Sequence, residues 1–280
     1  MAELRIDPED WAAAIADTNG PQLIVGGPGT GKTEFLVRRA VHLIESGLAT
    51  PDQVLLLSFS RRGAAGLRER IEEALAGAHT EFDASTFHSF SFRLLETYAA
   101  DSLDWNQMPT LLTSLEYVLR VRELLSAEDP AEWPSLFRGL LGSTTFAEEV
   151  SDFMLRCSEL LIDPGSLATR GREDWRALPG FIARYRSQTL AANRIDYGTL
   201  QASAVEALEH GPSLQDLAGR YRYVLVDEYQ DTTLAQAELL RALVGGGSHL
   251  TVAADPYQSI FSFRGTDLQN VANFPEDFSA

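Results

Sequence analysis

Four short runs of apolar residues stand out along the chain, and three of them are followed by a segment with helical spacing. In the first of these segments Leu36, Ala40 and Ile44 recur every four positions, as on one face of a helix. Runs without polar alternation are typical of strands that are buried on both faces of a sheet. The runs lie at residues 23–25, 54–57, 223–226 and 250–253. Strands that alternate with helices predict an α/β fold with a mainly parallel sheet.

The stretch between about Glu96 and Asn193 has a different pattern. It has helical periodicity, contains three of the four tryptophans, and shows no run that predicts a strand. We interpret it as an all-helical insertion within an α/β domain. The expected division is therefore a first part of the α/β domain at 1–95, an insertion at 96–195 and a second part of the α/β domain at 196–280.

Composition excludes several classes of protein. No apolar run approaches the roughly 20 residues that cross a bilayer, and the N-terminus MAELRIDPED lacks the basic-then-apolar order of a secretion signal. We therefore expect a cytoplasmic protein without a membrane segment. The only cysteine, Cys157, excludes an internal disulfide and is expected to be a small core residue, and the five histidines are too scattered to predict a metal site.

The net charge of −17 argues against a nucleic-acid partner, because such binders are usually basic. An acidic chain can still hold a single strand in a narrow groove, where bases stack on aromatic side chains and a few arginines contact the backbone. If this chain binds DNA, we expect its affinity to depend only weakly on salt.

A glycine-rich loop follows the first apolar run directly and opens the first helix. Its glycines allow several backbone N–H groups to point at a phosphate, and the helix N-terminus adds donors and partial positive charge. Lys32 is the only lysine among 23 basic residues, and it is expected to reach the terminal phosphates, with the Thr33 hydroxyl on Mg²⁺. The predicted nucleotide-binding residues are Gly26, Gly27, Pro28, Gly29, Thr30, Gly31, Lys32 and Thr33.

A phosphate loop of this kind needs a carboxylate at the end of a neighbouring strand. The third apolar run ends at two adjacent acids, Asp227 and Glu228. We expect Asp227 to hold the magnesium, directly or through water, and Glu228 to orient and deprotonate the attacking water. This pairing favours a hydrolase over a protein that only binds nucleotide.

Five segments in order resemble the motifs of the UvrD/Rep/PcrA group of superfamily-one DNA helicases, and of the related RecB-like and Adn-type motors. The resemblance implies a RecA-like P-loop domain that uses ATP and Mg²⁺ and acts on single-stranded DNA or a duplex–single-strand junction, in repair or recombination. The segments are GGPGTGKT (26–33), SFSRRGAA (58–65), STFHSF (85–90), DEYQD (227–231) and ADPYQSIFSFRG (254–265).

The resemblance also assigns roles to residues outside the phosphate loop. Gln258 is implied as the sensor of the γ-phosphate, and Lys32 and Glu228 as the catalytic pair. DNA contacts are implied for Phe59, Thr86, His88, Phe263 and Arg264. Two of these carry alternatives: Phe59 could be a core residue at a strand end, and a lone histidine such as His88 is often structural.

This chain departs from the family pattern at three positions and ends before the family's second motor domain. Asp10 stands where a glutamine normally reads adenine, Phe263 replaces a tryptophan, and Ala254 replaces a glycine. An aspartate cannot donate as an amide does. The second domain of the family supplies an arginine that raises the turnover rate about 10³- to 10⁵-fold. We therefore expect the 280 residues alone to bind nucleotide but to be nearly inert as an ATPase.

Two other functions remain open at this point. One is a P-loop ATPase or GTPase outside the helicases, which would lack the arrangement from Gln258 to Phe263-Arg264. The other is a catalytically silent, helicase-like subunit that serves as a scaffold or partner subunit, which the presence of Lys32, Asp227 and Glu228 disfavours.

Overall fold

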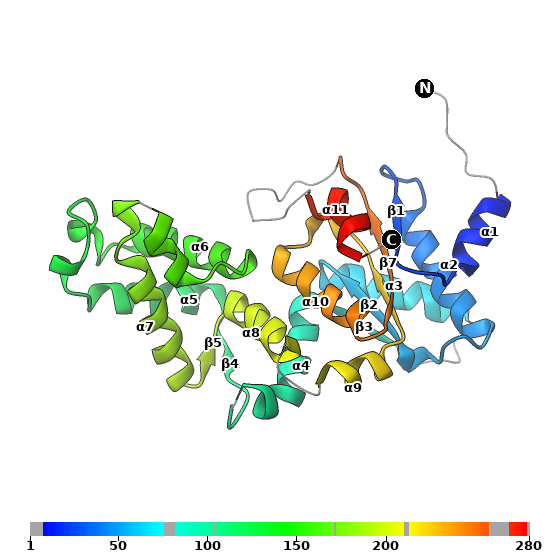
Figure 1. Ribbon diagram of the computed structural model, residues 1–280, viewed down its shortest axis with the longest axis horizontal. Coiled ribbons are helices and arrows are strands. Elements are labelled where there is room, and N and C mark those ends of the chain that lie inside the picture. Colours follow the sequence, from blue (N-terminus) through cyan, green and yellow to red (C-terminus); the bar gives the residue numbers. More distant parts are fainter. Residues whose placement is uncertain are drawn as a thin grey trace. The chain divides into compact units, whose positions relative to one another are not determined.

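The computed structural model describes residues 8–75, 82–103, 105–170, 172–209, 213–257 and 269–278. The chain divides into two compact units (Figure 1). Unit 1 comprises Met1–Phe90 and Gly211–Ala280, and unit 2 comprises Ser91–His210.

Unit 1 contains a five-stranded sheet in which every pairing is parallel, in the order β1-β7-β6-β2-β3. The predicted α/β class with a parallel sheet is confirmed, and the four apolar runs are strands of this sheet. The strands are β1 (Gln22–Val25), β2 (Val54–Ser58), β3 (Asp83–Thr86), β6 (Tyr223–Val226) and β7 (His249–Ala254).

Strand β3 was not among the predicted strands. Its sequence, Asp-Ala-Ser-Thr, has no apolar run, and it pairs only with β2, as an edge strand. Ser58 lies opposite Thr86 in this pairing. An edge strand has neighbours on one side only, so a polar sequence is compatible with it.

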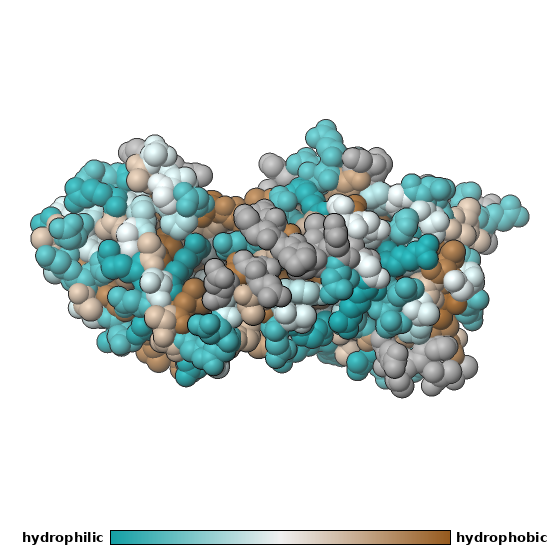
Figure 2. Space-filling model, turned by 60° about the horizontal axis from the view of Figure 1, so that its bottom comes forward, coloured by the Kyte–Doolittle hydropathy of each residue, from teal (hydrophilic) through white to brown (hydrophobic). Residues whose placement is uncertain are grey.

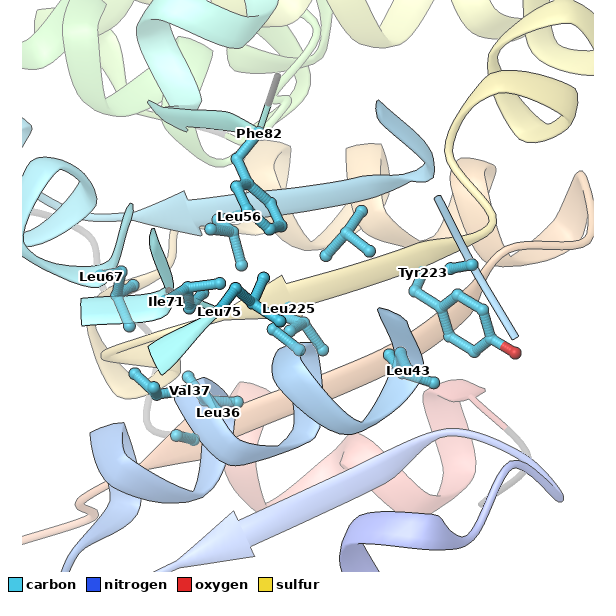
Figure 3. Packing of buried hydrophobic residues seen from close by; sticks show 14 residues of the cluster. Leu36, Val37, Leu43, Leu56, Leu67, Ile71, Leu75, Phe82, Tyr223 and Leu225 are labelled. Carbon is cyan, nitrogen blue, oxygen red and sulfur yellow. The ribbon is translucent and has the colours of Figure 1, made fainter. Parts of the chain in front are cut away.

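Helices α2 (Lys32–Glu45) and α3 (Arg61–Ala74) cover one face of this sheet (Figure 3). Leu36 and Leu43 of α2 and Ile71 of α3 meet Leu56 and Leu225 of the strands, all fully buried. Helix α1 (Pro8–Ala16) packs on α2, where the buried guanidinium of Arg39 donates to the carbonyls of Ala14 (3.3 Å) and Ile15 (2.8 Å).

The opposite face of the sheet is also buried, because strand residues of the other parity, such as Leu57, Val226 and Val252, have no exposed surface. Helix α10 contacts β7, and α9 and α11 pack on α10. These helices are α9 (Ser213–Arg220), α10 (Leu234–Gly245) and α11 (Gln269–Phe278). Helix α4 (Phe87–Ser102) follows β3 and runs from unit 1 into unit 2. Two 3₁₀ turns, η1 (Pro51–Gln53) and η6 (Tyr229–Asp231), complete the described elements of unit 1.

Unit 2 is mainly helical, with a core of its own around the fully buried Trp133, Val121 and Phe181, where Cys157 is also buried. The prediction that residues 96–193 contain no strand was wrong for two residues. Thr110–Leu111 (β4) pairs in parallel with Arg194–Ile195 (β5), a ladder too short to leave a pattern in sequence. The helical elements are α5 (Ser114–Ser126), η2 (Pro130–Glu132), η3 (Arg138–Leu140), α6 (Thr144–Glu159), η4 (Pro164–Arg170), η5 (Glu173–Trp175), α7 (Leu178–Ala191) and α8 (Tyr197–Glu209).

One face of the molecule is largely polar (Figure 2). Figure 2 shows one face of the molecule, on which hydrophilic residues predominate and hydrophobic ones appear in separate small areas. Among the described residues, no helix combines the length and the apolar character that a membrane span requires.

Candidate functional site: a phosphate loop facing two carboxylates

The glycine-rich loop joins the end of β1 to the start of α2. Gly29 (φ 71°) and Gly31 (φ 94°) take left-handed backbone conformations that residues with a Cβ rarely adopt, and Gly31 caps α2 without a side-chain hydrogen bond. The loop is tied to β7, because the N–H of Gly26 donates to the carbonyl of Ala254 at 3.2 Å. A curled loop at a helix N-terminus presents backbone N–H groups to an anion, which suits a phosphate.

Gly26 lies against the other side of the loop. A Cβ at this position would stand 2.4 Å from Thr30 Oγ1 and 3.4 Å from Lys32 Cγ. Thr30 Oγ1 donates to the carbonyl of Gly27 at 2.8 Å, so the threonine side chain is held in this position. The loop can close this tightly because residue 26 has no side chain.

The Lys32 ammonium points into the loop. Its Nζ donates to the carbonyl of Gly27 at 2.9 Å and lies 3.6 Å from Oδ2 of Asp255. The Lys32 side chain is 11% exposed and the Asp255 side chain 1%. A buried ammonium requires a counter-charge, and Asp255 supplies it at the end of β7. Sequence reasoning assigned no role to Asp255, although it lies two residues after the fourth apolar run.

Thr33 and Asp227 meet across the sheet. Thr33 Oγ1 donates to Asp227 Oδ2 at 3.1 Å, although the two residues are 194 positions apart. The expectation that the acids end a strand next to β1 was wrong, since β7 lies between β1 and β6. Helix α2 bridges this gap because it contacts both β7 and β6, and its first turn therefore reaches Asp227.

The Asp227 carboxylate has the features of a cation ligand. Burial raises its pKa, the nearby Glu228 raises it further, and the Thr33 hydrogen bond lowers it again in part. A divalent cation beside Asp227 and Thr33 would favour the charged carboxylate, so these two oxygens fit Mg²⁺. Among the described residues, no group of three His, Cys, Asp or Glu side chains could hold a metal ion. Mg²⁺ in nucleotide sites needs only one or two protein ligands besides phosphates.

Glu228 has an unusual backbone. Its φ of 57° and ψ of 44° are left-handed, which is uncommon for a glutamate. Its N–H donates to Asp227 Oδ1 at 3.1 Å, and its Oε2 accepts from Gln230 Nε2 at 2.6 Å. The residue is partly exposed. Strained conformations of this kind cluster at functional sites.

The described residues expected to contact DNA lie at the same edge of the sheet. Phe59 follows β2 and is 39% exposed, so it is not a core residue. Thr86 ends β3 and is buried, and its hydroxyl accepts from the N–H of Ser89 (3.2 Å) at the start of α4. His88 is largely buried, which lowers its pKa to about 4 and leaves the ring neutral at physiological pH. Gln258, Phe263 and Arg264 lie outside the described residues.

Two further aromatic residues were assigned no role from the sequence: Tyr257 follows β7 and Trp11 lies in α1. Tyr257, two residues after Asp255, is 95% exposed at the carboxyl edge of the sheet. The Trp11 ring approaches Gly31 so closely that a Cβ there would be 3.2 Å from Trp11 Cη2. Trp11 also packs edge-on against Phe35, while Asp10 beside it is exposed. Helix α1 therefore abuts the phosphate loop through Trp11.

The parallel sheet, the glycine-rich loop between β1 and α2, the inward lysine and the acids at the tip of β6 together define a P-loop nucleoside triphosphatase domain. The chain matches the UvrD/REP helicase N-terminal domain over residues 6–279. It therefore belongs to the UvrD/REP helicase family, as its N-terminal domain.

Individual relatives agree with this assignment. The chain is 30% identical over 277 residues to the ATP-dependent DNA helicase UvrD1 of Mycobacterium tuberculosis H37Rv, and 31% identical over 281 residues to that of Mycobacterium leprae. It is 27% identical over 268 residues to the ATP-dependent DNA helicase PcrA of Bacillus subtilis. In each comparison the match covers 95% of this chain but only 35% of the relative.

Proposed function

We propose that this chain binds Mg·ATP and single-stranded DNA as part of an ATP-dependent DNA helicase or translocase that acts in repair or recombination in the cytoplasm. Residues 1–95 and 196–280 form the first motor domain in this proposal, and residues 96–195 are an accessory insertion. A second motor domain completes the enzyme, and a partner subunit is compatible with this arrangement. The family match and the names of the relatives support the proposal.

One observation carries the proposal for the nucleotide site: the 3.1 Å hydrogen bond between Thr33 Oγ1 and Asp227 Oδ2. It joins the phosphate loop to the acid pair in the arrangement that a magnesium ion between them requires. Residues 26–33 would hold the phosphates, Thr33 and Asp227 would hold the ion, and Mg²⁺ would neutralise charge on the phosphates. Lys32 would neutralise the terminal phosphate, and Glu228 would take a proton from the attacking water.

The carboxyl edge of the sheet is the proposed path of the DNA strand. Phe59 and, outside the described residues, Phe263 would stack on bases, each worth about 1–3 kcal/mol. Thr86, His88 and Arg264 would contact the strand, and Gln258 would sense the γ-phosphate. His88 would act as a neutral hydrogen-bonding group, because its lowered pKa of about 4 leaves no charge to offer a phosphate.

The nucleotide site is tested by separating binding from hydrolysis. Lys32→Ala should weaken binding of a fluorescent ATP analogue with Mg²⁺ by at least tenfold, and Lys32→Arg should not restore it, because a planar guanidinium does not fit the loop. Glu228→Gln should bind as the wild type does and, in the full-length protein, should lose hydrolysis. Arg68→Ala on α3 removes an exposed positive charge away from the loop and serves as the matched control.

The outcomes separate the alternatives. Equal loss of binding in Lys32→Ala and Glu228→Gln would refute the separate roles. A wild-type chain that fails to bind Mg·ATP would favour the scaffold function. Steady turnover by the 280 residues alone at rates normal for a helicase would refute the proposed need for a second motor domain.

The DNA path is tested by fluorescence anisotropy with a labelled oligo(dT). Phe59→Ala should weaken binding about 5- to 160-fold, the equivalent of one stacked base. Leu136→Ala, at an exposed apolar residue of unit 2, should leave it unchanged. The affinity should also vary little with salt, since the chain carries a net charge of −17. A steep dependence on salt would show that many phosphates are neutralised and would contradict the stacking mode.

A further inference from the structure

Gln230 joins the two strand ends that carry the site. It lies in η6 and is 1% exposed. Its Nε2 donates to Glu228 Oε2 at 2.6 Å, and its Oε1 accepts from the backbone N–H of Asp255 at 2.8 Å. One amide group thus connects the carboxylate after β6 to the backbone at the end of β7.

The Glu228 carboxylate depends on this contact for its direction. Within the described part of the chain, Gln230 is the only side chain that hydrogen-bonds to it. The left-handed backbone of Glu228 sets where the side chain begins, but its rotatable bonds leave the position of the carboxylate open. A hydrogen bond from a buried amide selects one of these positions.

The other end of the amide lies beside the lysine. Asp255, whose N–H is held by Gln230, places its Oδ2 3.6 Å from Lys32 Nζ, and its Oδ1 accepts from the N–H of Tyr257 at 3.1 Å. Gln230 therefore fixes Glu228 relative to the strand end that carries the counter-charge of Lys32. The Gln230 side chain therefore links the position of the Glu228 carboxylate to that of the Lys32 ammonium.

We propose that Gln230 is a positioning residue that aims the Glu228 carboxylate at the water attacking the nucleotide; this rests on the proposed function of Glu228 as the base. The chemistry requires an amide, because the side chain must donate on one side and accept on the other. A glutamate would keep an acceptor for Asp255 N–H but would bring a second carboxylate against Glu228. A leucine would fill the space and make neither bond.

The test is single-turnover cleavage of ATP by the full-length protein, because the 280 residues alone are expected to be nearly inert. The protein is in excess of the nucleotide, so that even slow cleavage yields a rate. Gln230→Leu and Gln230→Glu should each bind Mg·ATP within about twofold of the wild type. Each should slow cleavage about 10²-fold, the usual effect of displacing a reacting group by an ångström. Adding Gln230→Leu to Glu228→Gln should slow cleavage no further, because a group that acts through Glu228 has nothing left to aim.

Gln236 provides a matched control. It is also a buried glutamine, but its amide oxygen accepts from the N–H of Thr233 at 3.2 Å and caps α10. Gln236→Leu should lower the melting temperature and leave the rate of cleavage per folded molecule unchanged. The nearly isosteric Gln230→Glu gives the answer if Gln230→Leu does not fold.

Three outcomes would overturn the proposal. Cleavage in the double variant well below that of Glu228→Gln alone would show that Gln230 acts independently of Glu228. Loss of Mg·ATP affinity as large as the loss of rate would indicate a general structural role. A wild-type rate no faster than that of Glu228→Gln would refute the proposed function itself, whereas a fast wild type with an equally fast Gln230→Glu would refute only the role of Gln230.

Discussion

Two glycines of α3 allow a sharp test of how closely this helix approaches the end of β2. A Cβ on Gly66 would meet no atom within 4 Å, whereas a Cβ on Gly63 would stand 2.4 Å from Ser58 Oγ and 3.2 Å from Ser60 Oγ. Ser58 is only 2% exposed, and Ser60 Oγ accepts from the N–H of Gly63 at 3.0 Å as the cap of the helix. Alanine should therefore have opposite effects at the two positions.

The expected magnitudes follow from these contacts. Gly66→Ala should stabilise the fold by about 0.5–1 kcal/mol, because alanine restricts the unfolded chain and favours the helix. Gly63→Ala brings the same stabilisation, but its Cβ must displace a buried hydroxyl and disturb the helix cap, which costs about 1–3 kcal/mol of stability. We expect the two variants to differ by about 1–3 kcal/mol, or roughly 2–12 °C in Tm for a unit of this size.

Urea unfolding followed by circular dichroism measures both free energies of unfolding. Adding Ser58→Ala to Gly63→Ala removes the 2.4 Å contact and should recover about half of the lost stability or more, relative to Ser58→Ala alone. If Gly63→Ala is as stable as Gly66→Ala, α3 does not lie this close to the end of β2.

Three further predictions concern the loop and two titrating residues. Gly26→Ala puts a Cβ 2.4 Å from Thr30 Oγ1, so Thr30 must leave its preferred rotamer and lose its hydrogen bond to Gly27, and Mg·ATP binding should weaken roughly tenfold. Adding Thr30→Gly should restore most of the affinity in a titration with a fluorescent nucleotide. If the affinity does not recover, the clash is refuted. Burial, and then the charge of Glu228, raise the pKa of Asp231 from 3.8 to about 6. The folded state therefore holds this proton longer than the unfolded state, and the associated stability is lost as pH rises from about 4 to 6. Asp231→Asn should remove this part of the pH dependence in urea titrations, and an unchanged profile would contradict it. For His88, burial lowers the pKa from 6.5 to about 4, so the free energy of unfolding should fall as pH falls through this range. His88→Gln should flatten this pH dependence. If the wild-type profile is no steeper than that of the variant, the ring is not buried in its neutral form.

Much of unit 1 could be predicted from sequence because its strands are continuous apolar runs and its phosphate loop has a fixed spacing of glycines around Lys32. The rest depends on which strands are neighbours, and local sequence does not carry that information. Strand β3 lacked a signal because an edge strand can be polar. The position of β7 between β1 and β6 also has no signal in the local sequence.

The same limit applies to the candidate site. Lys32 and Thr33 stand at the start of a helix and Asp227 and Glu228 follow the end of a strand, positions that the sequence indicates, and Thr33 contacts Asp227. The links made by Gln230 arise only because β6 and β7 are adjacent, which brings Asp255 N–H within 2.8 Å of the amide. A glutamine beside two acids has no pattern that would reveal this.

The left-handed backbone of Glu228 places stability and the proposed catalytic role in conflict at one residue. Glycine adopts this geometry without strain and asparagine with less, whereas glutamate loses about 1–2 kcal/mol to it. Laboratory evolution of this chain for heat resistance alone should therefore favour replacement of Glu228, the acid that we propose as the base for hydrolysis. Any thermostable descendant should be sequenced at position 228 before it is trusted as an enzyme.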